Sequence, residues 1–249
     1  MTNPMEQFSI HRMHGMSLMG YDVSFTNSAL WMLIALALVA VFMIAGTSSP
    51  KLVPTRAQAA VEYIYDFVVK MVGENVGPGG KRYVPLIFSI FIFVLALNLL
   101  GLLPWIGAFT PTSHVAVTLA LALIVFLVVL VVGFLKHGLH FLTLFWPKGM
   151  NVGLALVILP IEVLSFFVRP FTLAIRLFAN MTAGHVLLQV FGSFVVALGS
   201  FGALPYVFGV VPLAVNVALG ALELLIAVIQ AYVFALLASI YLNDAVNLH

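Results

Sequence analysis

Three apolar runs in the first part of the chain are each long enough to cross a membrane as one helix. They cover residues 28–46, 83–103 and 112–135. A hydrocarbon core of ~30 Å needs about 20 apolar residues in helical form, and each run meets that length. Pro104 follows the second run and interrupts the helical pattern. We therefore predict a first span at 28–46 and a helical hairpin at 83–135.

The segment between the first two runs, residues 50–82, mixes charged and apolar positions. Between residues 55 and 75, apolar residues recur at helical spacing on one side, namely Ala60, Val61, Ile64, Phe67, Val68 and Met71. The opposite side carries Arg56, Glu62, Asp66 and Lys70. This pattern predicts an amphipathic helix on the cytoplasmic membrane surface, followed by a turn-rich loop up to residue 82.

Two longer apolar stretches, residues 152–191 and 203–243, make up most of the C-terminal part of the chain. A helix of ~40 residues extends ~60 Å, about twice the thickness of the hydrocarbon core. We expect the two helices to form a hairpin through residues 192–202 and to tilt steeply or break. The kink points available to them are Pro160, Pro170, Pro205 and Pro212.

Composition excludes most soluble functions. Only 7% of the residues are charged and 63% are hydrophobic, whereas soluble domains carry roughly 25% charged residues. We expect a single all-α integral membrane domain over residues 1–249. The chain has no cysteine, which excludes disulfides and thiol chemistry. It lacks metal-binding, P-loop and dinucleotide motifs and a nucleophile beside a base, so we expect no cofactor, no metal, no bound nucleotide or nucleic acid, and no catalytic site.

Basic residues predict the orientation of the chain. Residues 1–27 are polar, lack the features of a signal peptide and form an N-terminal outer segment. Seven of the ten basic residues fall on one side of the predicted spans, at Lys51, Arg56, Lys70, Lys81, Arg82, Lys136 and Lys148. The positive-inside rule assigns that side to the cytoplasm. The N-terminus is then outside and the C-terminus cytoplasmic.

Charged residues inside the first long helix are the strongest functional signal. Glu162, Arg169 and Arg176 follow one another at seven-residue spacing. On a helix they share an arc of roughly 80° with other polar residues, among them Asn180. An arginine in a membrane helix costs from ~3 to more than ~10 kcal/mol, so this stripe must face protein or water.

The second long helix carries its own polar row, Asn216, Glu223 and Gln230, again at seven-residue spacing. His185 projects from the side of its helix opposite the arginine stripe. Because histidine titrates near neutral pH, His185 and Glu223 form a candidate proton relay. Gln230 and Asn180 also fit simple hydrogen bonding between helices.

Structural alternatives stay open for the ionisable residues. Arg176 can form a buried ion pair with Glu162 or Glu223. Glu162 can serve a water-filled access path or neutralise Arg169. His185 can be a hydrogen-bonded core histidine without a role in proton transfer. The two stripes together favour ion translocation more than any single residue does.

Three segments resemble one family, the a subunits of rotary F-type ATP synthases. They are Leu173–His185 (LAIRLFANMTAGH), Asn98–Pro104 (NLLGLLP) and Glu223–Gln230 (ELLIAVIQ). The resemblance covers roughly residues 50–243 and is most specific from residue 155 onward. Members of this family are multi-pass proteins of the bacterial inner membrane or of organellar inner membranes, and the lack of a transit peptide favours a bacterial home.

The resemblance implies a specific role. The family forms the stator half of a proton channel against a ring of c subunits, with two aqueous half-channels that couple proton flow to ring rotation and ATP synthesis. Arg176 matches the arginine between the half-channels, and Asn180 and Gln230 match residues that flank it. His185 and Glu223 match relay groups of the outer half-channel, although other members place an acid and a histidine in the opposite order.

The resemblance also implies partners. Beside the c ring these are the b-type peripheral stalk, the remaining ATP synthase subunits and membrane lipid, with ATP chemistry confined to other subunits. Glu162 and Arg169 match polar positions of the family. Two rival functions are a proton-coupled secondary transporter, against which the lack of an inverted repeat counts, and a purely structural membrane anchor.

Overall fold

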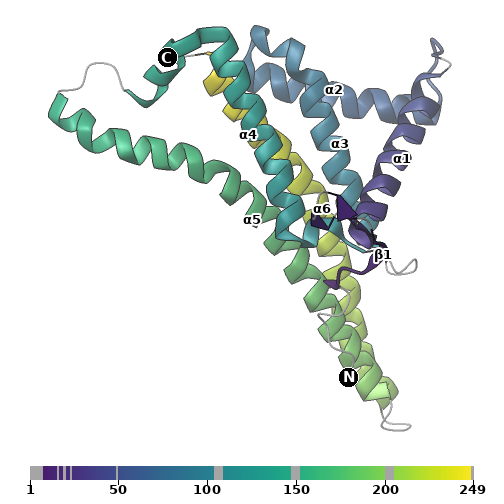
Figure 1. The fold of residues 1–249 in the computed structure, drawn as a ribbon. Coiled ribbons are helices and arrows are strands. Elements are labelled where there is room, and N and C mark those ends of the chain that lie inside the picture. Colours follow the sequence, from purple (N-terminus) through teal and green to yellow (C-terminus); the bar gives the residue numbers. More distant parts are fainter. Residues whose placement is uncertain are drawn as a thin grey trace. The chain divides into compact units, whose positions relative to one another are not determined.

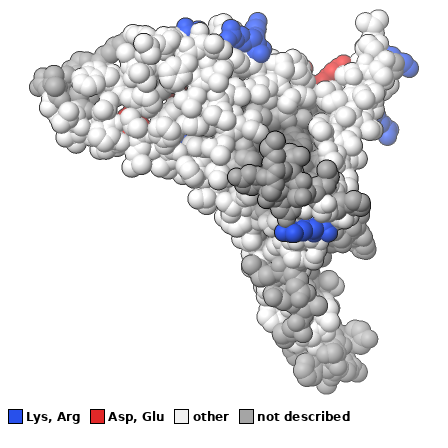
Figure 2. All heavy atoms as spheres, in the orientation of Figure 1, with Lys and Arg blue, Asp and Glu red and all other residues white. Residues whose placement is uncertain are grey.

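The computed structural model describes residues 8–15, 17–18, 21–22, 24–48, 50–103, 109–146, 152–199 and 205–247. In these ranges the chain forms α-helices, short 3-10 helices and four strands of two or three residues. Five of the helices are long and apolar enough to cross a membrane. The predicted all-α membrane protein is confirmed. On the face drawn in Figure 2, side chains that are neither acidic nor basic dominate the surface.

The first helices agree with the predicted spans to within a few residues. They are α1 (Asn27–Thr47), α3 (Val84–Gly101) and α4 (Val115–His137) (Figure 1). The 3-10 helices are η2 (Pro78–Tyr83), η4 (Pro111–Ser113) and η5 (Gly138–Phe145). Pro104, where the second span was predicted to end, and Lys148 lie outside the described residues.

The N-terminal segment contains short strands that its polar sequence did not predict. β1 (Arg12–His14) pairs antiparallel with β4 (Phe25–Thr26), and β2 (Ser17–Leu18) pairs antiparallel with β3 (Tyr21–Asp22). Asn27 ties the strands to the start of α1. Its side-chain Oδ1 accepts from the His11 amide at 3.2 Å and its Nδ2 donates to the Ser9 carbonyl at 3.1 Å.

The amphipathic helix is α2 (Arg56–Val76). Thr55 caps its start, because the threonine hydroxyl accepts from the Gln58 amide at 3.3 Å. Gly77 ends it with a φ of 76°, a conformation that glycine adopts without strain. As predicted, Val61, Val68 and Met71 are buried and the four charged side chains are exposed. Phe67 is 39% exposed, more than its place on the apolar face predicted.

The two long helices are α5 (Val152–Gly199) and α6 (Pro205–Val246), with 48 and 42 residues. Neither is broken, although Pro160 and Pro170 lie inside α5 and Pro212 inside α6. Helix α5 extends beyond the predicted end at residue 191, because residues 192–199 are apolar or small and contain no proline to stop the helix. Residues 200–204, which include the predicted start of the second helix, lie outside the described ranges.

The chain divides into two compact units. The first unit contains residues 1–39, 93–114 and 177–231, and the second contains residues 40–92, 115–176 and 232–249. In the first unit the end of α5 runs antiparallel to the start of α6 (Figure 1). Three neighbouring pairs agree with this direction, since positions later in α5 lie beside positions earlier in α6. The pairs are Asn180 with Gln230, His185 with Glu223, and Gly192 with Asn216.

Phenylalanine rings from α4, η5 and α5 pack together in the second unit. The Phe166 ring of α5, 2% exposed, contacts rings from α4 and η5, namely Phe126, Phe141 and Phe145.

The C-terminus of α6 is capped by basic side chains. Lys136 Nζ and His137 Nε2 donate to the Val246 carbonyl at 2.8 and 3.1 Å, where a cation also opposes the negative end of the helix dipole.

Candidate functional site

His185 and Glu223 face each other across α5 and α6 in the first unit. The distance from His185 Nε2 to Glu223 Oε1 is 3.8 Å, and the two side chains are 12% and 3% exposed. Neither oxygen of Glu223 has a hydrogen-bond partner among the described residues. A buried carboxylate without hydrogen bonds is costly unless a proton or a cation neutralises it. The structure thus places these two predicted site residues beside each other, at a distance too long for a direct hydrogen bond.

Gly184 makes this close approach possible. A Cβ built on Gly184 would lie 2.6 Å from Glu223 Oε1 and 2.8 Å from its Cδ. Any larger residue there would push the carboxyl group away from α5. The glycine immediately before His185 therefore sets the position of Glu223, a role that the sequence motif alone does not reveal.

Thr110, in the segment before α4, is the hydrogen-bond partner of His185. Its Oγ1 lies 3.0 Å from His185 Nε2 and 3.5 Å from the Gly101 carbonyl. If the hydroxyl donates to that carbonyl, it accepts from the Nε2–H of the imidazole. Thr110 is 4% exposed. His185 Nε2 thus has a hydroxyl and a carboxylate within reach, which suits a group that passes a proton between neighbours.

Two amides next to this pair connect the helices. Asn180 Nδ2 donates to Gln230 Oε1 at 2.9 Å, and Gln230 is 3% exposed while Asn180 is exposed. Asn98 of α3 is fully buried and donates to the Ala227 carbonyl of α6 at 3.2 Å. The interhelical hydrogen bond that the sequence left open for Asn180 and Gln230 is present. Asn98 was part of a recognised motif, but its partner was not predictable.

In the second unit, Arg169 pairs with Asp244, a residue that the sequence analysis did not select. Arg169 Nη1 donates to Asp244 Oδ2 at 2.6 Å, with the two side chains 24% and 26% exposed. The guanidinium also lies over the rings of Phe166 and Tyr241, at 5.5 and 5.2 Å from their centroids. Glu162 is half-buried and forms no ion pair within the described ranges.

Arg176 differs from Arg169. Its side chain is exposed, and among the described residues no hydrogen bond or ion pair holds it. The buried ion pair with Glu162, one of the alternatives for Arg176, is therefore absent in the part of the chain that the structure describes. An arginine on a helix that is apolar enough to span a membrane is expected to face protein or water rather than lipid.

We expect the Arg169–Asp244 pair to contribute modestly to stability. Changing Asp244 to Asn leaves the guanidinium without its counter-charge, and partial exposure limits the loss to about 1 kcal/mol. The measurement is a double-mutant cycle of Arg169→Gln and Asp244→Asn, scored by the midpoint temperature of unfolding of the detergent-solubilised protein. The double variant loses less than the sum of the single variants if the pair interacts. Strict additivity would contradict this prediction.

Comparison with known proteins agrees with the site. The family model described as "ATP synthase A chain" matches residues 29–243. The chain is 48% identical to "ATP synthase subunit a" of Paramagnetospirillum magneticum, covering 100% of both chains. It is 50% identical to the protein of that name from Mesorhizobium japonicum, over 98% of this chain and 96% of the relative. It is 51% identical to that of Zymomonas mobilis, over 99% and 97%. The chain, whose described residues include five helices apolar enough to cross a membrane, belongs to the ATP synthase A chain family.

Proposed function

We propose that this chain is the proton-conducting stator subunit of a bacterial rotary ATP synthase. One observation carries the proposal: a buried carboxylate, Glu223, lies 3.8 Å from His185 between two helices that are apolar enough to span a membrane. Ionisable groups at such positions are costly and mark ion pathways. The relatives named ATP synthase subunit a support the same role.

Each of the predicted site residues has a task in this proposal. Glu223 and His185 line the outer half-channel and pass protons toward the c ring. Arg176 faces the ring carboxylates between the outer and inner half-channels. Asn180 lies four residues after Arg176 on α5, and in this proposal Asn180 and its partner Gln230 flank the arginine and hydrate it through water rather than by a direct hydrogen bond.

The remaining charged residues of the α5 stripe complete the proposed pathway. Glu162 and Arg169 belong to proton translocation, and Asp244 orients Arg169 through the 2.6 Å hydrogen bond. The chain binds no nucleotide and has no catalytic site of its own, so ATP chemistry belongs to partner subunits. We propose that it assembles with the c ring, the b-type peripheral stalk and the other ATP synthase subunits in the inner membrane, with the N-terminus outside and the C-terminus cytoplasmic.

The proposed role of Arg176 follows from the fixed positive charge of its guanidinium group. A guanidinium is always protonated and favours an ionised carboxylate arriving in front of it, so the ring group releases its proton on reaching Arg176. The same charge repels a proton that would cross directly between half-channels. Both effects are stronger in a low-dielectric membrane than in water.

Removal and restoration of the chain tests this function. Inverted vesicles from cells that lack the chain are expected to hydrolyse ATP without acidifying, and expression of the chain restores acidification. An affinity tag on the chain is expected to co-purify a ring of small hydrophobic subunits. Proton movement driven by a solute gradient in liposomes that contain only this chain would contradict the proposal and establish a secondary transporter.

Thr110 provides a finer test of the outer pathway. Thr110→Val keeps the shape of the side chain but removes the hydroxyl from His185, at a cost of about 1 kcal/mol. If that cost falls on the proton-transfer step, ATP-driven acidification slows about fivefold. Thr110→Ser restores the hydroxyl and is expected to recover most of the rate. Equal rates in the Val and wild-type complexes would remove Thr110 from the pathway.

A further inference from the structure

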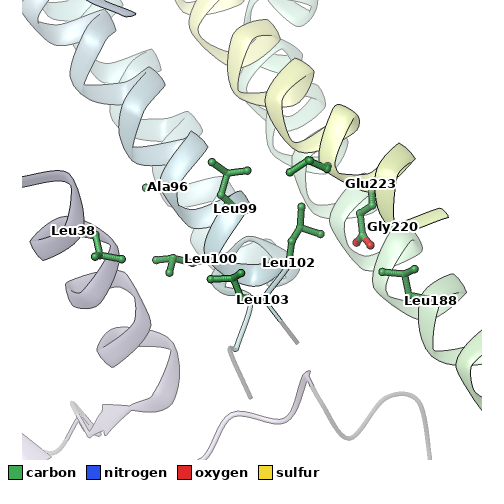
Figure 3. Close-up of a pocket in the computed structure, with 10 residues that line it drawn as sticks. Leu38, Ala96, Leu99, Leu100, Leu102, Leu103, Leu188, Gly220 and Glu223 are labelled. Carbon is green, nitrogen blue, oxygen red and sulfur yellow. The ribbon is translucent and has the colours of Figure 1, made fainter. Parts of the chain in front are cut away.

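A pocket of about 530 Å³ lies beside Glu223 in the first unit (Figure 3). Its volume is within the range of pockets that hold small organic ligands. Helices α1, α3, α5 and α6 and the residues directly after α3 form its wall. The lining residues are Leu38, Ala96, Leu99, Leu100, Leu102, Leu103, Leu188, Gly220, Glu223 and Leu224.

Among the described residues that line the pocket, Glu223 is the one with a charged side chain. Figure 3 shows Glu223 on α6 among leucines that come from the other helices of the wall. The side chain is 3% exposed, and neither of its oxygens has a hydrogen-bond partner among the described residues. His185 Nε2 faces Oε1 at 3.8 Å and is also 3.0 Å from Thr110. Both oxygens are buried and Oε2 has no hydrogen-bond donor among the described residues, so a cation that enters the pocket would supply the missing partner.

We propose that this pocket binds an apolar ammonium ion, an amine with a compact hydrocarbon body. The ammonium pairs with the carboxylate of Glu223 and donates a hydrogen bond to Oε2. The hydrocarbon body lies against leucines such as Leu99 and Leu188. A purely hydrocarbon occupant, for example a lipid acyl chain, offers the buried carboxyl group no hydrogen-bond donor, whereas an ammonium offers both a donor and a counter-charge, and this favours a ligand that carries a positive charge.

Inhibition is a second consequence, which rests on the proposed function. A bound ammonium holds Glu223 as a carboxylate and occupies the space beside it, so the residue no longer accepts a proton from His185. ATP hydrolysis by a coupled complex then slows, because rotation requires proton transfer. Binding itself does not depend on that role.

Binding is tested on purified ATP synthase that contains this chain, reconstituted in lipid nanodiscs. The probe is radiolabelled 1-adamantylamine, and the control ligand is 1-adamantanol, which has the same cage without the charge. We expect saturable binding of the amine, about tenfold tighter than that of the alcohol. Glu223→Gln is expected to lower amine affinity about tenfold and leave the alcohol unaffected. Ala96→Phe fills the pocket and is expected to weaken both ligands while Glu223 stays in place.

Several results would overturn the proposal. These are equal affinity of the amine and the alcohol, amine binding that Glu223→Gln leaves unchanged, and binding that survives Ala96→Phe. Nanodiscs hold no proton gradient, so the amine cannot act by dissipating one. Amine binding without loss of ATP hydrolysis would support the pocket and count against the proton-transfer role of Glu223. Acidification by the ligand-free Glu223→Gln complex tests that role separately.

Discussion

Replacing Arg176 by alanine is expected to abolish ATP-driven acidification of inverted vesicles while the complex still assembles. The side chain is exposed and forms no hydrogen bond or ion pair with the described residues, so its loss leaves no partner unsatisfied. A guanidinium facing a carboxylate near a protein surface contributes several kcal/mol, so we expect the rate to fall about a hundredfold or more.

Passive proton leak separates the two tasks of the arginine. If the charge also blocks direct transfer between half-channels, Arg176→Ala vesicles leak protons when the catalytic subunits are inhibited. Thr172→Ala is the matched control, because Thr172 lies one turn earlier on α5, is exposed and bonds only to the Arg169 carbonyl in the described structure. A fully assembled Arg176→Ala complex that pumps at the wild-type rate would remove Arg176 from the mechanism and support a structural anchor.

The second large effect is expected at Glu223. Glu223→Gln keeps the size of the side chain but removes the group that takes up and releases a proton, and the general acid–base contribution of one positioned group is about a hundredfold or more. Acidification is therefore expected to fall by about that factor in assembled complex. The pair distance of 3.8 Å predicts a further result. Exchanging both residues, His185→Glu with Glu223→His, should recover part of the activity that each single change loses.

Two observations would contradict this role for Glu223. One is wild-type acidification by the Glu223→Gln complex. The other is a double variant, His185→Glu with Glu223→His, whose acidification rate is no higher than the product of the fractional rates of the two single variants. That result would mean that the two residues act independently. Leu225→Ala, an exposed position two residues later on α6, controls for general damage to the helix.

The sequence predicted most helices well, because a helix depends on the pattern of apolar and polar residues only a few positions apart. Runs of apolar residues located α1, α3 and α4, and the helical spacing of Val61, Val68 and Met71 predicted the buried side of α2. The extent of α5 was less predictable, because a stretch of small apolar residues is compatible with both a helix and a connection. The short N-terminal strands carry no alternating pattern that would have predicted them.

Within the candidate site, the residue types and spacings on each helix were readable from the sequence. Seven-residue spacing predicted that Glu223 and Gln230 share one face of α6, and both are buried there. The choice of His185 as partner of Glu223 rested on residue chemistry and a family resemblance. The distance of 3.8 Å between them depends on Gly184 as well.

Contacts between distant segments were decided only by the tertiary structure. Thr110 is 75 residues from His185, Arg169 is 75 residues from Asp244, and Asn98 is 129 residues from Ala227. Helical periodicity determines which side chains share a face, because it follows from backbone geometry alone. It does not determine which other segment packs against that face. That choice depends on the packing of the whole chain, so the sequence predicted the polar stripes while the structure decided their partners.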